Sequence, residues 1–165
     1  MITLISPRIT LQKYDTFTTG IVYMPFLLAY LAGHLKSLNI KYSLIDCFGE
    51  DPENWEISSK DVYRGIDNKI LLKKLDKISS ENSNNEMFFI LYAINASYHQ
   101  DLLNILKLIR KEYPDAKILI AENSQAVTAY AISSVKNEFF ALGADALITG
   151  DLELSISLLY KSWLE

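Results

Sequence analysis

The chain has very few of the residues from which metal and redox centres are built. Among its 165 residues there is one cysteine and there are two histidines. A single thiol, Cys47, excludes an intrachain disulfide and any zinc or iron–sulfur site made from several cysteines. We therefore expect no iron–sulfur cluster in this chain and an inert, buried thiol at Cys47.

Long hydrophobic runs and clustered positive charge are also missing. The most apolar stretch, residues 24–35, is interrupted by Tyr30 and His34 and stays below the roughly 18 residues that a membrane span needs. The net charge is −4 and no stripe of lysine and arginine is present, which argues against nucleic-acid binding. The first five residues lack a basic leader and predict a strand. We expect a cytoplasmic protein with neither nucleic acid nor membrane as a partner.

The familiar nucleotide and phosphate motifs of α/β proteins do not occur. Ser6-Pro7-Arg8 follows the first apolar run, where a P-loop or a dinucleotide fingerprint would need glycines. A phosphoryl-receiver domain would need carboxylates after the first strand, an aspartate after the third and a lysine after the fifth, where this chain has Ser6, Asn95 and Gly150. Residues 16–20 only weakly match the hydroxyl-rich phosphate loop of flavodoxins. No Ser/His/Asp or Cys/His arrangement has a credible spacing either.

What the chain does have is a regular alternation of apolar runs and amphipathic segments. Half of its residues are hydrophobic and 22% are charged, which is typical of one globular domain over residues 1–165. Segments with helical spacing follow the apolar runs, which predicts an α/β three-layer sandwich of the flavodoxin-like or Rossmann-like type: a five-stranded parallel sheet with helices on both faces. The strands are expected at residues 2–5, 41–45, 87–94, 118–121 and 146–149. The helices are expected at about 25–38, 66–78, 99–113, between 122 and 142, and at 152–163.

Local signals refine this prediction. The run at 87–94 is continuously apolar, as in a strand covered on both faces, and should be central. Asp67 can cap the second helix, and Asn39 can take the left-handed position after the first. The polar stretches 8–20 and 47–64 are predicted to be connections, and the loop 79–86 to be the most mobile part.

Ligands of parallel α/β sheets bind beyond the carboxyl ends of the strands. The polar residues after the predicted strands should therefore face one crevice. There, His99 could bind a metal or move a proton, or simply face solvent at a helix start. Glu122, Asp151 and Glu153 form an acidic set, although Asp151 and Glu153 are also favourable in a first helical turn on charge alone. From the residues alone we expect a small-ligand-binding domain, with an independent enzyme using Glu122, His99 or Asp151 as acid/base groups as the alternative.

Several landmarks occur together in a specific order. They are the opening strand with Ser6-Pro7, the segment 20–32 (GIVYMPFLLAYLA), Asp46 after the second strand, Arg64-Gly65-Ile66, Gly143-Ala144-Asp145 and Gly150-Asp151-Leu152-Glu153. In this order the chain resembles the amino-terminal cobalamin-binding domain of cobalamin-dependent radical S-adenosylmethionine enzymes. Segment 20–32 is similar to that family's Gly, then aromatic-Pro-Leu-Gly-Leu-Ala-Tyr-Leu-Ala signature. Ala121-Glu122 stands where the family usually has a glycine pair.

The resemblance implies a cofactor, a partner domain and a set of binding residues. Cobalamin would lie over the carboxyl edge of the sheet with its nucleotide tail between strands, and the chemistry would occur in a following radical S-adenosylmethionine barrel, so that this chain alone is not catalytic. The implied set contains no catalytic residue and no metal ligand from the chain. The alternative is a degenerate domain of the same fold that serves as an interaction or scaffold module. The implied cofactor-binding residues are Ser6, Asn95, Ser97, His99, Glu122, Asn123, Ser124, Gly150 and Glu153.

Overall fold

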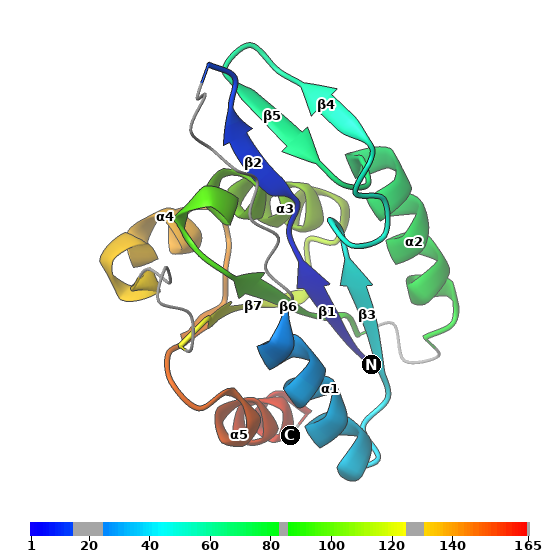
Figure 1. Ribbon diagram of the computed structural model, residues 1–165. Helices are drawn as coiled ribbons and strands as arrows, with labels where there is room; N and C mark the ends of the chain where they lie inside the picture. The colour runs from blue at the N-terminus through cyan, green and yellow to red at the C-terminus, as the bar shows by residue number, and fades with distance from the viewer. Residues whose placement is uncertain (15–24, 83–85, 125–130, 165) are drawn as a thin grey trace.

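A five-stranded parallel sheet forms the centre of the protein (Figure 1). The computed structural model describes residues 1–14, 25–82, 86–124 and 131–164. The spatial order is β3-β1-β6-β7-β8, and each neighbouring pair is parallel, which confirms the predicted sheet. The strands are β1 (Ile2–Ser6), β3 (Tyr42–Asp46), β6 (Phe88–Ala93), β7 (Lys117–Glu122) and β8 (Ala146–Ile148).

Helices cover both faces of this sheet and complete the three layers. Side chains of β6 alternate between the two faces: Phe88 and Ile90 pack in one apolar cluster, and Phe89 and Leu91 in the other. All six residues of β6 are buried, so it is the central strand that its apolar run predicts. The first cluster lies under α1 (Phe26–Ser37) and α5 (Leu152–Leu164), and the second under α2 (Asn68–Ser80), α3 (His99–Glu112) and α4 (Lys136–Ala141). Short 3-10 turns, η1 (Ala96–Tyr98) and η2 (Ile132–Val135), precede α3 and α4.

The local signals in the sequence give the expected structures. The Asp67 carboxylate accepts a hydrogen bond from the Ile70 N–H at 2.8 Å and caps α2. Asn39 has a φ of 57° directly after α1. Cys47 is buried as a free thiol. The helix α2 continues through Ser80, so the predicted loop 79–86 begins later than expected, and residues 83–85 lie outside the described residues. No helix in the described part of the chain is both long enough and apolar enough to cross a membrane.

A second, three-stranded antiparallel sheet is the feature that the sequence did not predict. It has the order β2-β5-β4 and occupies parts of stretches 8–20 and 47–64, which were wrongly expected to be connections only. Its strands are short, and β2 pairs with β5 from a distant part of the chain, so no local hydrophobic period marks them. The strands are β2 (Ile9–Gln12), β4 (Trp55–Ile57) and β5 (Asp61–Arg64).

The second sheet extends from the carboxyl ends of β1 and β3 (Figure 1). At the end of β1 the Ser6 carbonyl accepts a hydrogen bond from the Cys47 N–H at 3.0 Å, and the Cys47 carbonyl accepts one from the Ile66 N–H at 2.7 Å. Gly65, which directly precedes Ile66, has a φ of +130°, and a Cβ at this position would collide with the Cys47 carbonyl. Only glycine allows the chain to return so close to the end of β3.

Candidate functional site

The polar ends of the parallel strands meet at one edge of the sheet, as expected. Ala93 at the end of β6 is in register with Glu122 of β7, and Ala121 of β7 with Ile148 of β8. Since these strands run in the same direction, Asn95, Ser124 and Gly150 follow them at the same edge. We call this edge the carboxyl rim and define its central part by Asn95, Ser97, Asn123, Ser124 and Gly150.

Asn95 and Asn123 form the base of the carboxyl rim. The Asn123 backbone N–H donates to the Ala93 carbonyl, and its side-chain Nδ2 donates to the Ile94 carbonyl, both at 3.1 Å. The Asn95 Oδ1 accepts the Ser97 N–H at 2.9 Å and caps η1. Both side chains are buried, with 4% and 6% of Asn95 and Asn123 exposed. Asn123 therefore ties the tips of β6 and β7 together, and Asn95 fixes the loop that carries Ser97.

The outer residues of the carboxyl rim are uncharged and open to solvent. Ser97, Ser124 and Gly150 are all exposed. Gly150 has a φ of +87°, and among the described residues no atom lies within 4 Å of a Cβ placed on it. This part of the rim therefore has exposed hydroxyl groups at Ser97 and Ser124 and open space beside Gly150.

The acidic residues near β8 have structural roles at the start of α5. The Asp151 carboxylate accepts the Leu154 N–H at 3.1 Å, which is the capping role that its position in the sequence allows. Glu153, in the first turn of α5, is half-buried, and its carbonyl accepts a hydrogen bond from the Ser157 hydroxyl at 2.8 Å. Its carboxylate lies in the turn where the helix dipole favours negative charge.

Glu122 faces the side of the sheet covered by α2, α3 and α4. Its Oε1 accepts the Ile132 N–H at 3.1 Å, so the carboxylate holds the first turn of η2. Side chains alternate along a strand. Ile120 packs in the cluster beneath those helices, whereas Ala121 packs in the cluster beneath α1 and α5. The methyl group of Ala121, not the Glu122 carboxylate, is therefore what β7 presents at its tip toward α1 and α5.

His99 is directed toward α4. Its Nε2 lies 3.4 Å from the Glu138 carboxylate, and its ring packs edge-on against Phe139 with 5.5 Å between the ring centroids. Its side chain is only 20% exposed. The described residues contain no group of three or more His, Cys, Asp or Glu side chains arranged to hold a metal ion. The geometry of His99 thus indicates a contact between α3 and α4.

A buried ion pair, missed by sequence reasoning, lies next to Ser6 at the end of β1. The Arg8 backbone N–H donates to Asp101 Oδ2 at 2.7 Å, and the Arg8 Nε and Nη2 donate to Oδ1 at 3.0 and 2.8 Å. Ser6, Arg8 and Asp101 are all essentially inaccessible to solvent. In the sequence Arg8 lies in a polar stretch and Asp101 in the first turn of a helix, and ordinary surface charges have the same sequence context.

The same arginine joins the second sheet to the main domain. Arg8 Nη1 donates to the Glu56 carboxylate of β4 at 2.6 Å, and its guanidinium lies 4.7 Å from the ring centroid of Tyr63 in β5. The Tyr63 hydroxyl accepts a hydrogen bond from Asn104 of α3 at 3.3 Å. These contacts hold the second sheet against α3 and cover the carboxyl rim on its β1 side.

Burial and the charge of the partner act in opposite directions on each member of this pair. It raises the pKa of the Asp101 carboxyl, and the charge and hydrogen bonds of Arg8 oppose that rise. Burial also acts to lower the pKa of Arg8, but the carboxylates of Asp101 and Glu56 outweigh it, so the net pKa lies above the ordinary value and the guanidinium stays charged. The charge on Asp101 therefore depends on Arg8 remaining in place.

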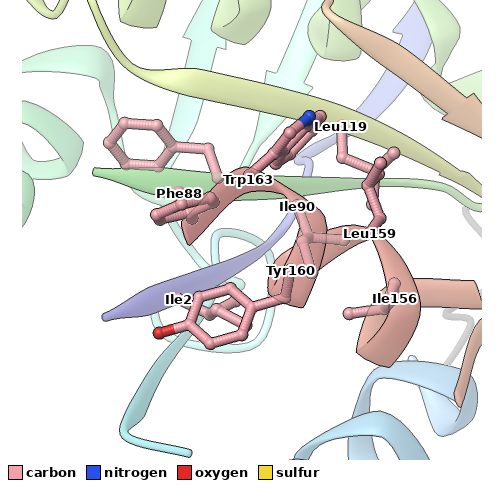
Figure 2. A pocket seen from close by; sticks show the side chains of 9 residues that line it. Ile2, Phe88, Ile90, Leu119, Ile156, Leu159, Tyr160 and Trp163 are labelled. Carbon is pink, nitrogen blue, oxygen red and sulfur yellow. The ribbon is translucent and has the colours of Figure 1, made fainter. Parts of the chain in front are cut away.

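An apolar cavity lies at the opposite end of the strands from the carboxyl rim (Figure 2). Its volume is about 10 Å³, which is room for about one water molecule. The Phe88 ring closes one side and packs against Tyr160 and Trp163 of α5, with ring centroids 5.1 and 5.8 Å away. Because it is small and has an aliphatic and aromatic lining, this cavity is a packing defect under α5 and no candidate cofactor site. The lining residues are Ile2, Phe88, Phe89, Ile90, Leu119, Ile156, Leu159, Tyr160 and Trp163.

Comparisons with protein-family models, with curated proteins and with solved structures found no match to this chain.

Proposed function

We propose that this chain is a cofactor-holding domain that binds cobalamin at the central part of the carboxyl rim. The observation that carries the proposal is that β6, β7 and β8 are parallel neighbours in the sheet and end at the same edge. Open parallel α/β sheets bind ligands beyond the carboxyl ends of their strands. Here those ends carry Asn95, Ser97, Ser124 and Gly150.

The residues of the rim fit the chemistry of this cofactor. Cobalamin is a flat macrocycle whose edge carries neutral amide groups, and such groups pair with hydroxyls, amides and backbone atoms rather than with charges. Ser97 and Ser124 offer exposed hydroxyls, and Gly150 leaves the adjacent space open. The Ala121-Glu122 departure from the family's glycine pair adds only a methyl group on the α1 and α5 side, because Glu122 is turned away from it.

Within the proposal each residue has a separate role. Ser97, Ser124 and Gly150 would contact the macrocycle, and Asn95 and Asn123 would hold their loops in place. His99 and Glu122 contact α4 and η2, and we assign them to support of the site instead of direct binding. Bound cobalamin would supply methyl-transfer or rearrangement chemistry to a radical S-adenosylmethionine barrel as the partner domain.

Hydroxocobalamin provides a direct test. The purified protein is mixed with it and passed over a gel-filtration column, and the absorbance of the corrin is followed in the protein peak. We expect the colour to co-elute with the protein and to be lost in Ser97→Tyr and Ser124→Tyr, whose rings would fill the open space. Ser80→Tyr, an exposed substitution at the carboxyl end of α2, is the matched control and should retain the colour. A colourless peak from the folded protein would overturn the proposal.

A second candidate function is an interaction module of the same fold without a cofactor. It is favoured by the second sheet, which Arg8 fixes over the β1 side of the carboxyl rim. This function predicts a folded protein that takes up no hydroxocobalamin and whose stability Ser97→Tyr and Ser124→Tyr leave unchanged. The gel-filtration experiment with hydroxocobalamin therefore separates the two candidates.

A further inference from the structure

The strand β4 has an open hydrogen-bonding edge. In the described part of the chain it pairs only with β5 and forms one edge of the second sheet. The Ser58 N–H donates to the Asp61 carbonyl and the Gly65 N–H to the Asn54 carbonyl, and these two pairs flank β4. Hydrogen-bonded pairs alternate in an antiparallel ladder. The backbone groups of the intervening Trp55 and Ile57 therefore point away from β5, toward the open edge.

The two outward-pointing residues are also large and exposed. Trp55 is 49% exposed and Ile57 is 66% exposed. They lie on one face of the strand because side chains alternate, whereas Glu56 between them faces Arg8. An exposed tryptophan beside an exposed isoleucine on an edge strand is the type of apolar anchor that binds a partner chain.

Trp55 is held rigidly in its exposed position. The guanidinium of Arg64 lies 4.3 Å from the centre of its ring. That guanidinium is itself fixed, because its Nε and Nη2 donate to the Pro52 carbonyl at 3.2 and 2.8 Å. A side chain that is already ordered loses little conformational entropy when a partner binds.

The surroundings of this edge are acidic. Residues 46–56 contain five carboxylates, and three of them lie near cations from elsewhere in the chain: Glu50 pairs with Lys74, Glu53 lies 3.9 Å from Arg64, and Glu56 shares Arg8 with the buried Asp101. Two carboxylates therefore share the single positive charge of Arg8. Side chains of Glu53 and Glu56 are 87% and 50% exposed. Beside β4 a groove of about 380 Å³ runs toward the first turn of α2, lined by Asn54, Trp55, Glu56, Asp67, Asn68 and Lys69. Among these described lining residues, Glu56 and Asp67 stand against Lys69, so the lining carries a net charge of −1 and favours positive charge in a ligand.

We propose that β4 binds an extended basic segment of another polypeptide, which adds a strand to the second sheet. Backbone groups of Trp55 and Ile57 would pair with the incoming strand, its apolar residues would cover the two exposed side chains, and its lysines or arginines would face the carboxylates. A second copy of this chain is a poorer partner. Antiparallel pairing of two β4 strands about Glu56 would place one Glu56 opposite the other, and like charges in directly opposed positions are destabilising.

The test uses a fluorescein-labelled peptide of alternating lysine and valine, with fluorescence anisotropy measured against increasing concentrations of the whole chain. We expect saturable binding that weakens severalfold between about 50 mM and about 500 mM salt, since screening acts on the charge pairs. A matched peptide of alternating glutamate and valine should not bind. Equal binding of both peptides, absence of binding by the lysine peptide, or concentration-dependent dimerisation through β4 would each overturn the proposal.

Variants of β4 test the geometry. Trp55→Ala should weaken binding at least about tenfold, as expected for a central aromatic anchor. Ile57→Pro removes an N–H that only the incoming strand would use, and proline is tolerated on the open side of an edge strand, so binding should fall about tenfold or more without loss of the folded state. Ile57→Val keeps the N–H and should bind as the original chain does. Similar binding by the proline and valine variants would refute strand addition, whatever the outcome with hydroxocobalamin.

Discussion

Replacing Arg8 with methionine removes the guanidinium from the buried pair while keeping most of the apolar stem of the side chain. Asp101, which is 0% exposed, then retains only the backbone N–H of residue 8 among the donors that the arginine residue provides. A buried carboxylate that loses its cation is strongly unfavourable. We expect Arg8→Met to lower the free energy of unfolding by about 3–4 kcal/mol at pH 7.

The upper end of this range follows from protonation of Asp101. A carboxyl group can avoid the buried charge by taking up a proton, and at pH 7 this costs about 4 kcal/mol for an ordinary pKa of about 3.9. The cost decreases by about 1.4 kcal/mol for each pH unit. The destabilisation caused by Arg8→Met should therefore be smaller at pH 5, by up to about 2–3 kcal/mol.

Urea denaturation of the original chain and the variant at pH 7 and pH 5, followed by circular dichroism, gives both values. The double variant Arg8→Met/Asp101→Leu removes the orphaned charge and should recover stability to within about 1 kcal/mol of the original. Lys74→Met, which removes a partly exposed ion pair with Glu50, is the matched control and should cost less than about 1 kcal/mol.

The reasoning is refuted if Arg8→Met costs less than about 1 kcal/mol, or if its cost is the same at pH 5 and pH 7. A double variant that is less stable than Arg8→Met alone would also contradict it. In that case the stability of the region would come from packing around the arginine stem rather than from compensation of the Asp101 charge.

Three further predictions follow from single positions. Gly65→Ala should destabilise the protein by at least about 2 kcal/mol, because Gly65 has a φ of +130° and the new Cβ would collide with the Cys47 carbonyl. Gly33→Ala in α1 is the contrasting change: no atom of the described residues lies within 4 Å of its new Cβ, so it should stabilise the protein by about 0.5–1 kcal/mol in the same denaturation assay. Burial raises the pKa of Cys47 well above its ordinary value, so a thiol reagent at pH 8 should modify it only in denaturant, and fast modification of the native protein would contradict the structure. Burial also raises the pKa of Asp46, and hydrogen bonds from the N–H groups of Gly49 and Phe48 oppose this rise. The protonated Asp46 carboxyl therefore contributes fully to stability below the ordinary pKa, and this contribution is lost as the pH rises through the higher pKa of the folded state. Asp46→Asn should remove that loss, so the variant should gain stability relative to the original chain between about pH 4 and pH 7, and parallel pH profiles would exclude this.

The positions of the parallel strands and their helices could be read from the sequence because both signals are local. A continuous apolar run such as the one in β6, or a helical period such as that of α3, depends only on residues close together in the chain. The Asp67 cap and the left-handed Asn39 are likewise local. Once the strands are known to be parallel, their ends must meet at one edge, so the carboxyl rim with Asn95, Ser124 and Gly150 also follows from the sequence.

The roles of individual side chains at that rim required the tertiary structure. Whether the Glu122 side chain faces α4 or α1 depends on which residues of β7 point to each face of the sheet and on the position of Ile132. His99 contacts Glu138 only after α3 and α4 have packed together. The second sheet depends on pairing between β2 and β5. The ion pair joins Arg8 to Asp101, and these two residues are separated by 93 positions in the chain. Hydrophobic periodicity determined which segments are strands and helices, because burial of one face is a local requirement. Long-range packing alone decided which charges are buried, which edge of the second sheet stays open and which polar groups remain at the rim, because these depend on neighbours that the chain brings together only when it folds.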